Sequence, residues 1–382
     1  MRAVLHPRVD DAARRDQSVR PSWWAERRHP ERRRDQRRRF RRDRLAIARR
    51  AFILGGTGNV GAAIAQSLAA DDWNVTLAGK TERPAREGFD YVTLDRDEDG
   101  ALSVADGFDL VVDVIPFEAA HALQLLGIDT GALVAISSAS VYADEQGRTL
   151  DEAQGVDDFP DFPVPIPETQ PTVEPGDETY STKKAKIERI LLENGRIPAA
   201  IVRPCAIYGN GDRMGREWFF VKRALDRRPH VVLTNRGAGQ FHTTASENIG
   251  ELVRLLADQP RTGAFNCGDP DPPTVLEIAR AIGDEAGHRF AEVLLEEPAS
   301  RGDVGQTPWS APKPLLIDMA KAEQELGYRP ATTWGEALPR QVRWLIEATR
   351  DRDWRDVLTR GADYVKFEYE AEDELVASLA KA

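Results

Sequence analysis

Short apolar runs alternate with helical stretches along the chain from Ala51 onward. Six runs have the length and the flanking turn residues of buried strands: 51–54, 74–78, 91–94, 110–115, 132–136 and 199–202. Ile64 and Leu68 are four residues apart on one face of a helix expected over 62–70, and a second helix is expected over 182–193. This alternation predicts crossover units and therefore an α/β fold with a doubly wound parallel sheet.

The pattern breaks between Ala143 and Thr179. This acidic segment holds six prolines: Pro160, Pro163, Pro165, Pro167, Pro171 and Pro175. So many prolines exclude a central strand or a long helix. A loop of this length in a compact domain is typically a lid or binding loop, or an insertion without such a role. Both interpretations stay open, because the segment joins the two candidate catalytic segments described below.

Charge is distributed very unevenly along the 382 residues. Residues 1–50 contain 18 arginines and 7 acidic residues, so their net charge is +11, and that of the remaining 332 residues is −22. The first 50 residues are interpreted as a disordered arm, either a nucleic-acid-binding tail or a stretch translated from a misplaced start codon. The second interpretation is favoured, because Arg50 abuts the first strand without a linker. The acidic body, with only nine lysines in the chain, is typical of salt-adapted proteins.

The cysteine count and hydropathy indicate a cytoplasmic protein. Only Cys205 and Cys267 occur, which fits a reducing compartment and provides neither a disulfide framework nor zinc-ligand spacing. No apolar run of about 18 residues is present for a membrane-spanning helix, and the start lacks the apolar core of a signal peptide.

A glycine-rich turn lies directly between the first strand and the first helix. Its sequence is Gly55-Gly-Thr-Gly-Asn-Val-Gly61. Glycines let the backbone turn tightly and approach a pyrophosphate, and the helix N-terminus offers N–H groups and partial positive charge to that anion. The strand-turn-helix context predicts a dinucleotide site. The residues expected to contact the cofactor are Gly55, Thr57, Gly58, Asn59, Val60 and Gly61.

Two further positions concern the adenosine end of the cofactor. Enzymes that use NAD typically hold an acid at the end of the second strand for the ribose hydroxyls, and this chain has Ala78-Gly79-Lys80 there. Lys80 can pair with a 2′-phosphate, and no carboxylate repels one, so NADP is favoured over NAD. Asp95, after the third strand, is a candidate acceptor for the adenine amino group or an ordinary turn residue.

A candidate catalytic centre follows from Tyr180 and Lys184, which are four residues apart on one helical face. Ser138 lies upstream, at the carboxyl end of a predicted parallel strand, where open sheets bind ligands. The tyrosine pKa, near 10 in water, must fall for Tyr180 to act as a base. A fall of about three units needs roughly 4 kcal/mol, which two close positive charges, the Lys184 ammonium and an oxidised nicotinamide, can supply. Tyr180 would then exchange a proton with a substrate oxygen that Ser138 polarises, and Lys184 would also hold the nicotinamide ribose.

Taken with these residues, several segments resemble the extended short-chain dehydrogenase/reductase superfamily, in its NAD(P)-dependent epimerase/dehydratase family. The matching segments cover about residues 51–345: the glycine turn, 136–142, 180–184, 203–209, 265–268, 318–322 and 326–330. The resemblance implies a Rossmann fold, Ser138 as the catalytic Ser/Thr, and hydride transfer at a hydroxyl or carbonyl carbon of a sugar-like or other small substrate. It also implies a homodimer, because relatives often pair through Rossmann-domain helices. The expected organisation is a dinucleotide-binding domain over 51–205, a substrate-binding region over 206–345 that returns strands to the sheet, and an extension over 346–382.

Departures from the family pattern affect the substrate. Ala206 replaces the asparagine that usually contacts the diphosphate of a nucleotide sugar, and Ala139 and Ser140 replace the Asp-Glu pair of dehydratases. Gly239-Gln-Phe-His242 lacks the usual arginine before the aromatic residue. An NADPH-dependent reductase acting on a non-sugar carbonyl therefore competes with a sugar epimerase.

A non-catalytic nucleotide-sensing or RNA-binding relative is the alternative from another class. Retention of Tyr180 and Lys184 argues against it, and the acidic body repels nucleic acid. His242 is expected to be structural rather than a substrate contact, and Trp218, Phe219 and Phe220 to be core residues rather than a pocket lining.

Overall fold

Seven parallel strands form the central sheet of the computed structural model, which describes residues 3–5, 48–82, 88–153, 155–297, 304–361 and 365–381. The strands are β2 (Arg50–Leu54), β3 (Asn74–Gly79), β4 (Asp90–Thr93), β5 (Leu110–Asp113), β6 (Leu133–Ile136), β7 (Ala199–Pro204) and β11 (Gly263–Cys267). Their order is β11-β7-β6-β5-β2-β3-β4, and every neighbouring pair is parallel. The chain thus reverses its direction of growth between β2 and β5, so the predicted doubly wound sheet is confirmed.

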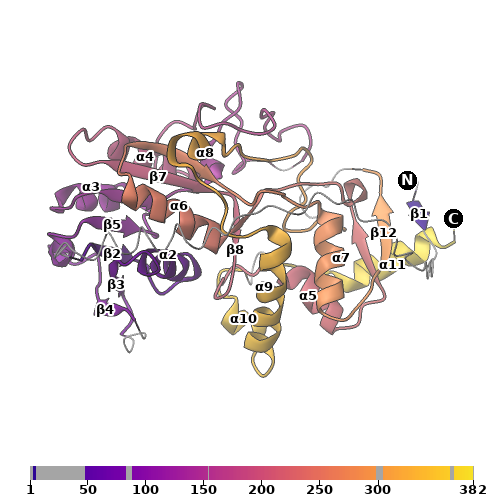
Figure 1. Ribbon diagram of the computed structural model, residues 1–382. Helices are drawn as coiled ribbons and strands as arrows, with labels where there is room; N and C mark the ends of the chain where they lie inside the picture. Colours follow the sequence, from indigo (N-terminus) through magenta and orange to yellow (C-terminus); the bar gives the residue numbers. More distant parts are fainter. Residues whose placement is uncertain are drawn as a thin grey trace, which may run out of the picture. The chain divides into compact units, whose positions relative to one another are not determined.

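Helices cover both faces of this sheet (Figure 1). On one face α2 (Asn59–Ala69) packs against α6 (Ser246–Asp258), with α8 (Ala320–Leu326) joining the same apolar core. On the other face lie α3 (Ala119–Gly127) and α4 (Tyr180–Leu192). The apolar side chains of α6 recur at helical spacing and are fully buried, which explains why this segment forms a covering helix: Ile249, Leu252, Val253 and Leu256.

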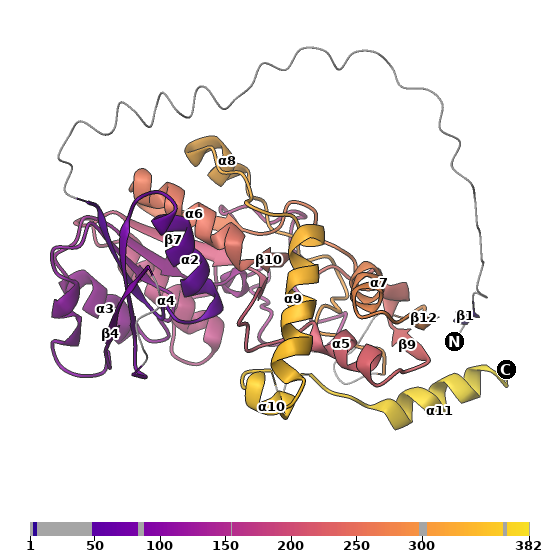
Figure 2. The same ribbon diagram turned by 60° about the horizontal axis from the view of Figure 1, so that its bottom comes forward.

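A second apolar core lies apart from the sheet. It joins α5 (Trp218–Leu225), α7 (Val275–Glu285), α9 (Trp334–Thr349) and α10 (Trp354–Val357) to β9 (His230–Leu233) and β12 (Ala291–Leu295). Trp218, Phe219 and Phe220 are buried in it, as expected. β9 and β12 pair in parallel, and the backbone of β1 (Ala3–Leu5) pairs with β12 antiparallel. β8 (Ala206–Tyr208), which follows β7 in the chain, forms a separate short parallel pair with β10 (Thr243–Ala245). The last helix of the described residues is α11 (Tyr369–Leu379) (Figure 2).

Two predicted segments have contrasting outcomes. The described part of 143–179 contains only isolated bridges, in line with the predicted loop, and it is held by the buried side chains of Phe159, Ile166 and Val173. The Arg-rich arm predicted over 1–50 lies outside the described residues, apart from 3–5 and 48–50. No helix in the described ranges combines the length and apolar character needed to cross a bilayer.

Candidate active site

The glycine turn has the geometry of an anion cradle. Gly55 adopts φ +77°, and its N–H donates to the carbonyl of Ala78 on the adjacent strand (3.0 Å). A Cβ at Gly61 would lie 2.4 Å from the carbonyl oxygen of Gly55, so only glycine allows α2 to approach the turn this closely. Gly58 is exposed and precedes the helix without a side-chain cap. The start of α2 is therefore open toward a negatively charged group.

The neighbouring cradle residues differ in what they can offer. Thr57 is half-buried within the turn. The Oδ1 of Asn59 accepts the N–H of Val60 (2.6 Å), while its buried Nδ2 has no hydrogen-bond partner among the described residues. The side chain of Val60 belongs to the core. The unpartnered Nδ2 of Asn59 and the glycine-lined opening fit a dinucleotide, although the Val60 N–H already donates to Asn59 and is not free for a phosphate.

Lys80 and Asp95 meet each other, which the sequence did not suggest. The register of β3 and β4 sets Gly79 opposite Thr93, so the residues just beyond both strands emerge together. Lys80 Nζ lies 2.7 Å from Asp95 Oδ2 and 3.9 Å from an oxygen of Asp97. This contact raises the pKa of Lys80 and lowers that of Asp95. Lys80 is nevertheless 71% exposed, so its ammonium remains accessible to a second anion.

Ser138 and Tyr180 lie together beyond the carboxyl end of β6. Ser138 caps the short 3-10 helix Ala139–Val141 by accepting the N–H of Ser140 (3.1 Å). Tyr180 is the first residue of α4, which begins there because Thr179 and Thr182 form a capping box. Desolvation raises the pKa of the Tyr180 hydroxyl, and a hydrogen bond with Ser138 opposes that rise. Tyr180 is 49% exposed, so a substrate could reach it.

Lys184 is buried one helical turn after Tyr180, and its Nζ lies 5.7 Å from the centre of the Tyr180 ring. Its Nζ donates to the carbonyls of Pro116 (2.8 Å) and Ile136 (3.0 Å), at the ends of β5 and β6. Desolvation lowers the pKa of Lys184 to about 8, although Asp113 and Glu188 act in the opposite direction. In the polypeptide alone the pKa of Tyr180 is raised, whereas the lowered pKa expected from the sequence depends on Lys184 together with an oxidised nicotinamide, so that expectation stays a prediction. A buried lysine by itself does not offset the desolvation of the phenol.

A buried ionic network fixes the strands and the helix that carry these residues. Arg203 on β7 donates from Nε to both oxygens of Glu188 on α4 (3.1 and 3.2 Å) and also hydrogen-bonds the Tyr142 hydroxyl (3.2 Å). Tyr142 in turn donates to Asn266 Oδ1 on β11 (2.7 Å). The network thereby ties the segment after Ser138 to the helix of Tyr180 and Lys184.

Several charged residues that the sequence analysis did not identify lie around Tyr180 and Lys184. Asp113, at the end of β5, is fully buried and pairs with Arg96 (2.7 Å). Asp151, from the proline-rich segment, accepts the N–H of Ser181 (3.1 Å) and raises the pKa of Tyr180, whereas Arg216 and Arg360 lower it. A carboxylate inside the apolar run 110–115 was the available signal for Asp113. For Asp151 and Arg360 the sequence offered none, because their positions depend on long-range packing.

His242 is structural, as expected. It is 3% exposed, its Nδ1 accepts the N–H of Ile317 (3.0 Å), and its Nε2 faces the carbonyl of Asp269 (2.8 Å). Desolvation lowers its pKa. Both ring nitrogens are engaged, so none remains for a substrate.

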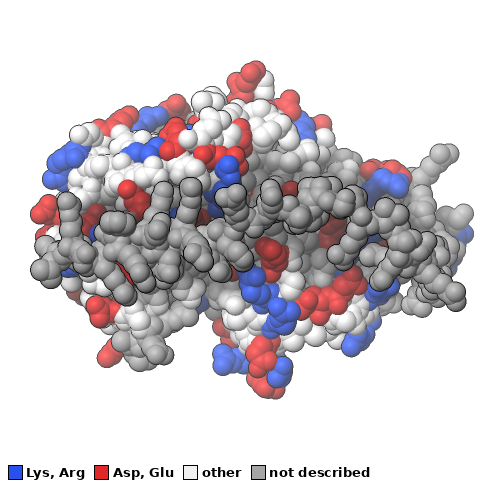
Figure 3. Space-filling view, viewed as in Figure 1, with Lys and Arg blue, Asp and Glu red and all other residues white. Residues whose placement is uncertain are grey.

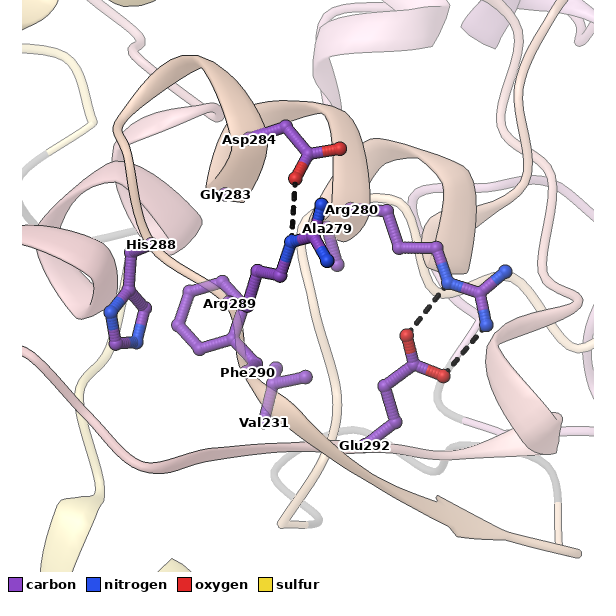
Figure 4. Close-up of a pocket in the computed structure, with 9 residues that line it drawn as sticks. All are labelled: Val231, Ala279, Arg280, Gly283, Asp284, His288, Arg289, Phe290 and Glu292. Atoms are coloured by element: carbon purple, nitrogen blue, oxygen red, sulfur yellow. Dashed lines mark hydrogen bonds and ion pairs between the residues drawn. The ribbon is translucent and has the colours of Figure 1, made fainter. Parts of the chain in front are cut away.

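A cavity of about 250 Å³ lies elsewhere, between α7 and β12 (Figure 4). Arg280 pairs there with both oxygens of Glu292 (2.7 Å each), and Arg289 pairs with Asp284 (3.4 Å). Its charged groups neutralise one another, and none of the predicted site residues lines it.

Several curated proteins resemble the chain in sequence. It is 26% identical over 200 residues to the 3β-hydroxysteroid dehydrogenase/Δ5→4-isomerase of Mycobacterium tuberculosis, a match that covers 45% of this chain and 53% of that protein. It is 27% identical over 258 residues to the 2′-dehydrokanamycin reductase of Streptomyces kanamyceticus, covering 64% and 68%. The chain thus matches about half the length of the steroid enzyme. No protein-family model matches the chain.

Solved structures share the fold. The UDP-glucuronic acid 4-epimerase of Bacillus cereus, in complex with UDP-glucuronic acid and NAD, superposes with a TM-score of 0.56 at 18% identity, covering 78% of this chain and 99% of that one. The epimerase Mth375 of Methanothermobacter thermautotrophicus has a TM-score of 0.62 at 19% identity, covering 82% and 95%. The resemblance predicted from the motifs is confirmed for the fold, a Rossmann-type sheet with a C-terminal part.

Proposed function

We propose that this chain, which has the fold of the extended short-chain dehydrogenase/reductase superfamily, is an NAD(P)-dependent oxidoreductase or epimerase. One observation carries the proposal: Ser138, Tyr180 and Lys184 converge at the carboxyl ends of β5 and β6, beside the strand that leads into the glycine turn. Ligands of open α/β sheets bind at this edge. The relatives include a dehydrogenase/isomerase, a reductase and epimerases, which supports this reaction class.

The glycine turn and α2 would hold the pyrophosphate, and Lys184 would hold the nicotinamide ribose. When bound, the dinucleotide accepts or supplies the hydride, and its oxidised ring adds a second positive charge near Tyr180. In the oxidative direction Tyr180 takes the proton of the substrate hydroxyl as the C–H bond gives up its hydride, and in the reverse direction it returns that proton. Ser138 donates a hydrogen bond to the same substrate oxygen.

NADP is the proposed cofactor, with NAD as the alternative. Lys80 is exposed at the end of β3, where a 2′-phosphate would lie. The ion pair of Lys80 with Asp95 competes with binding of the phosphate, so a 2′-phosphate must either share the Lys80 ammonium with Asp95 or displace the Asp95 carboxylate. Asp95 Oδ1 already accepts the N–H of Asp97 (3.2 Å), so a hydrogen bond from the adenine amino group would share an oxygen that has a partner.

The substrate is proposed to be a small molecule, either sugar-like or another carbonyl compound. The first choice is an epimerase/dehydratase-family reaction on a nucleotide-sugar-like substrate, supported by the structural neighbours. The second is an NADPH-dependent carbonyl reductase, which the likeness to 2′-dehydrokanamycin reductase favours.

Other expectations also stay proposals. They are the domain division into 51–205, 206–345 and 346–382, homodimerisation, and a cytoplasmic location. The two free thiols support that location. Acidic and basic side chains are interspersed on the uncovered part of the face seen in Figure 3, without a large basic patch there, which favours a reaction without nucleic acid over an RNA-binding role.

A hydride-transfer screen tests the proposal. The purified protein is incubated with NADPH and a panel of sugar and non-sugar carbonyl compounds, and loss of nicotinamide absorbance is followed. Because an epimerase returns its hydride to the substrate and consumes no net cofactor, nucleotide sugars are incubated with the oxidised dinucleotide and the epimers are separated by chromatography. Tyr180→Phe should lower turnover roughly 10²–10⁴-fold, because it removes the acid/base group, while NADPH affinity stays within about threefold, since the phenol does not hold the phosphates. Equal turnover by the wild type and Tyr180→Phe would contradict the assigned role.

A further inference from the structure

Asp113 is a carboxylate buried within the central sheet. It ends β5, has no exposed surface, and lies opposite Ala135 in the parallel register of β5 and β6. Residues directly opposite each other on neighbouring strands point to the same face of a sheet. Ala135 belongs to the apolar core that includes Ile187 and Leu191 of α4. The side chain of Asp113 therefore lies on the sheet face that is covered by α4, the helix of Lys184.

Arg96 pairs with Asp113 and joins it to α3. Arg96 is 7% exposed, and its Nη1 lies 2.7 Å from Asp113 Oδ2. Its Nε donates to Gln124 Oε1 on α3 (3.2 Å), and the Gln124 amide donates back to the carbonyl of Arg96 (2.8 Å). The desolvation of a buried ion pair offsets much of its attraction, so such a pair is weak evidence for a role in stability alone. Its location beside the candidate active site indicates a role there.

The same ion pair fixes the turn 114–116 that follows β5. Asp113 Oδ1 accepts the N–H of Ile115 (2.9 Å), and Arg96 Nη1 donates to the carbonyl of Ile115 (3.4 Å). Both backbone groups of Ile115 are therefore held by the pair. A Cβ at Gly55 would lie only 3.0 Å from the side chain of Ile115, so the turn also packs against the glycine turn of the dinucleotide site.

The end of this turn binds the ammonium of Lys184. The carbonyl of Pro116 accepts a hydrogen bond from Lys184 Nζ (2.8 Å), and the ring centre of Phe117 lies 5.0 Å from the same Nζ. The second acceptor of Nζ is the carbonyl of Ile136 (3.0 Å), which directly follows Ala135 on β6. Lys184 is thus held by two backbone carbonyls, one on each side of the strand ends, and the Asp113 pair fixes the first of them.

The charges near this ammonium come from several elements. Desolvation lowers the pKa of Lys184 to about 8, and the carboxylates of Asp113 and Glu188 limit that fall. The titratable groups around Lys184, with the partners of the two carboxylates, are Asp113 of β5, Arg96, His121 of α3, Tyr180 and Glu188 of α4, and Arg203 of β7. Removing Asp113 takes away a negative charge, whereas removing Arg96 leaves that negative charge unneutralised. The two changes should therefore act on the ammonium in opposite directions.

We infer that Asp113 is a positioning residue for Lys184: it holds the turn whose Pro116 carbonyl binds the Lys184 ammonium, and together with Arg96 it sets the charge around that ammonium. This inference rests on the proposed function, because it takes Lys184 as the residue that holds the nicotinamide ribose. The role differs from that of Glu188, which anchors α4 to β7 through Arg203. The Arg96–Asp113 pair thus belongs to the machinery of the site and not only to the packing of the sheet.

The test is a nuclear magnetic resonance titration of the full chain with lysine labelled by ¹³C at Cε. The chain has only nine lysines, and Lys184→Arg identifies the Lys184 signal. Asp113→Asn keeps an oxygen for the Ile115 N–H but removes the charge, so it should move the titration midpoint of Lys184 down by about one pH unit or more. Arg96→Met should move that midpoint up by a similar amount.

The matched control is Asp144→Asn, which should leave the Lys184 midpoint unchanged. Asp144 is 3% exposed and pairs with Arg148 at the same 2.7 Å, and the hydrogen bonds of its carboxylate to described residues stay within 146–161. The melting temperature of each variant shows whether it is folded, and either Asp113→Asn or Arg96→Met alone decides the point if the other does not fold.

Two outcomes would overturn the inference: the Lys184 midpoints of Asp113→Asn and Asp144→Asn agree, or Arg96→Met does not raise the midpoint above that of the wild type. Once a substrate is known, the basic limb of the turnover profile should move with the midpoint, and an unmoved limb would also overturn the inference. The titration needs neither cofactor nor substrate. Absence of NADPH binding by the wild type would refute the proposed function, and the titration would still decide the link between Asp113 and Lys184.

Discussion

Removing the carboxylate of Glu188 should destabilise the protein strongly, because it strands the charge of Arg203. Both side chains are less than a tenth exposed, and a 2.5 Å contact and two longer hydrogen bonds join them. Breaking one partner of such a buried pair typically costs about 3–5 kcal/mol. We therefore expect Glu188→Gln to lower the free energy of unfolding by roughly that amount. The double variant Glu188→Leu with Arg203→Met should recover most of the loss, since it removes both buried charges.

Urea unfolding, followed by tryptophan fluorescence and circular dichroism, measures these differences. The single variants Glu188→Leu and Arg203→Met complete the cycle with the double variant and give the coupling free energy of the pair. The control is Glu292→Gln, which breaks the 2.7 Å surface pair with Arg280 and should cost less than about 1 kcal/mol. The reasoning fails if Glu188→Gln and Glu292→Gln cost the same, or if the effects of the Glu188 and Arg203 substitutions are simply additive.

Two further predictions concern the site itself. Gly61→Ala should abolish NADPH binding and lower the melting temperature, because its Cβ would lie 2.4 Å from the Gly55 carbonyl oxygen. Gly58→Ala, whose Cβ comes no nearer than 3.6 Å to described atoms, should weaken NADPH binding about tenfold or more at an unchanged melting temperature. Equal NADPH affinities of the wild type and Gly58→Ala would argue against a dinucleotide site at the glycine turn. Turnover should fall as the pH rises through about 8, because burial lowers the pKa of Lys184 to about 8 and the ammonium form, which would hold the nicotinamide ribose, predominates only below that pH. A turnover rate that is flat between pH 7 and 9.5 would contradict the role of the Lys184 ammonium.

The sequence predicted those elements whose signal is local. Strands with an uninterrupted apolar run, such as β2, could be identified within a few residues, because buried parallel strands leave a local pattern. The helix expected over 182–193 begins two residues earlier, at Tyr180, where Thr179 and Thr182 form a capping box. β11 was not identified as a strand because Gly263–Cys267 begins with a glycine and has Asn266 in its interior, so it lacks an uninterrupted apolar run. That asparagine is buried only because Tyr142 and the carbonyls of Ile166 and Asp318 surround it.

The candidate site divides in the same way. Ser138, Tyr180 and Lys184 could be proposed from motif spacing, and the structure brings them together at one sheet edge. The ion pair between Lys80 and Asp95 could not be predicted from the sequence, because the two residues meet only through the register of β3 with β4. The position of Arg360 also lay beyond prediction, because its backbone is bonded to a loop about 150 residues earlier in the chain.

The most direct test of the central claim is a titration of the purified full-length protein with NADPH and with NADH, followed by nicotinamide fluorescence, for the wild type and Lys80→Asp. We predict saturable binding of both cofactors, tighter for NADPH, and a reversal of this preference in Lys80→Asp, where a carboxylate would repel the 2′-phosphate and accept the ribose hydroxyls. If neither cofactor binds the wild type, the glycine turn is not a dinucleotide site and the proposed hydride-transfer function is wrong.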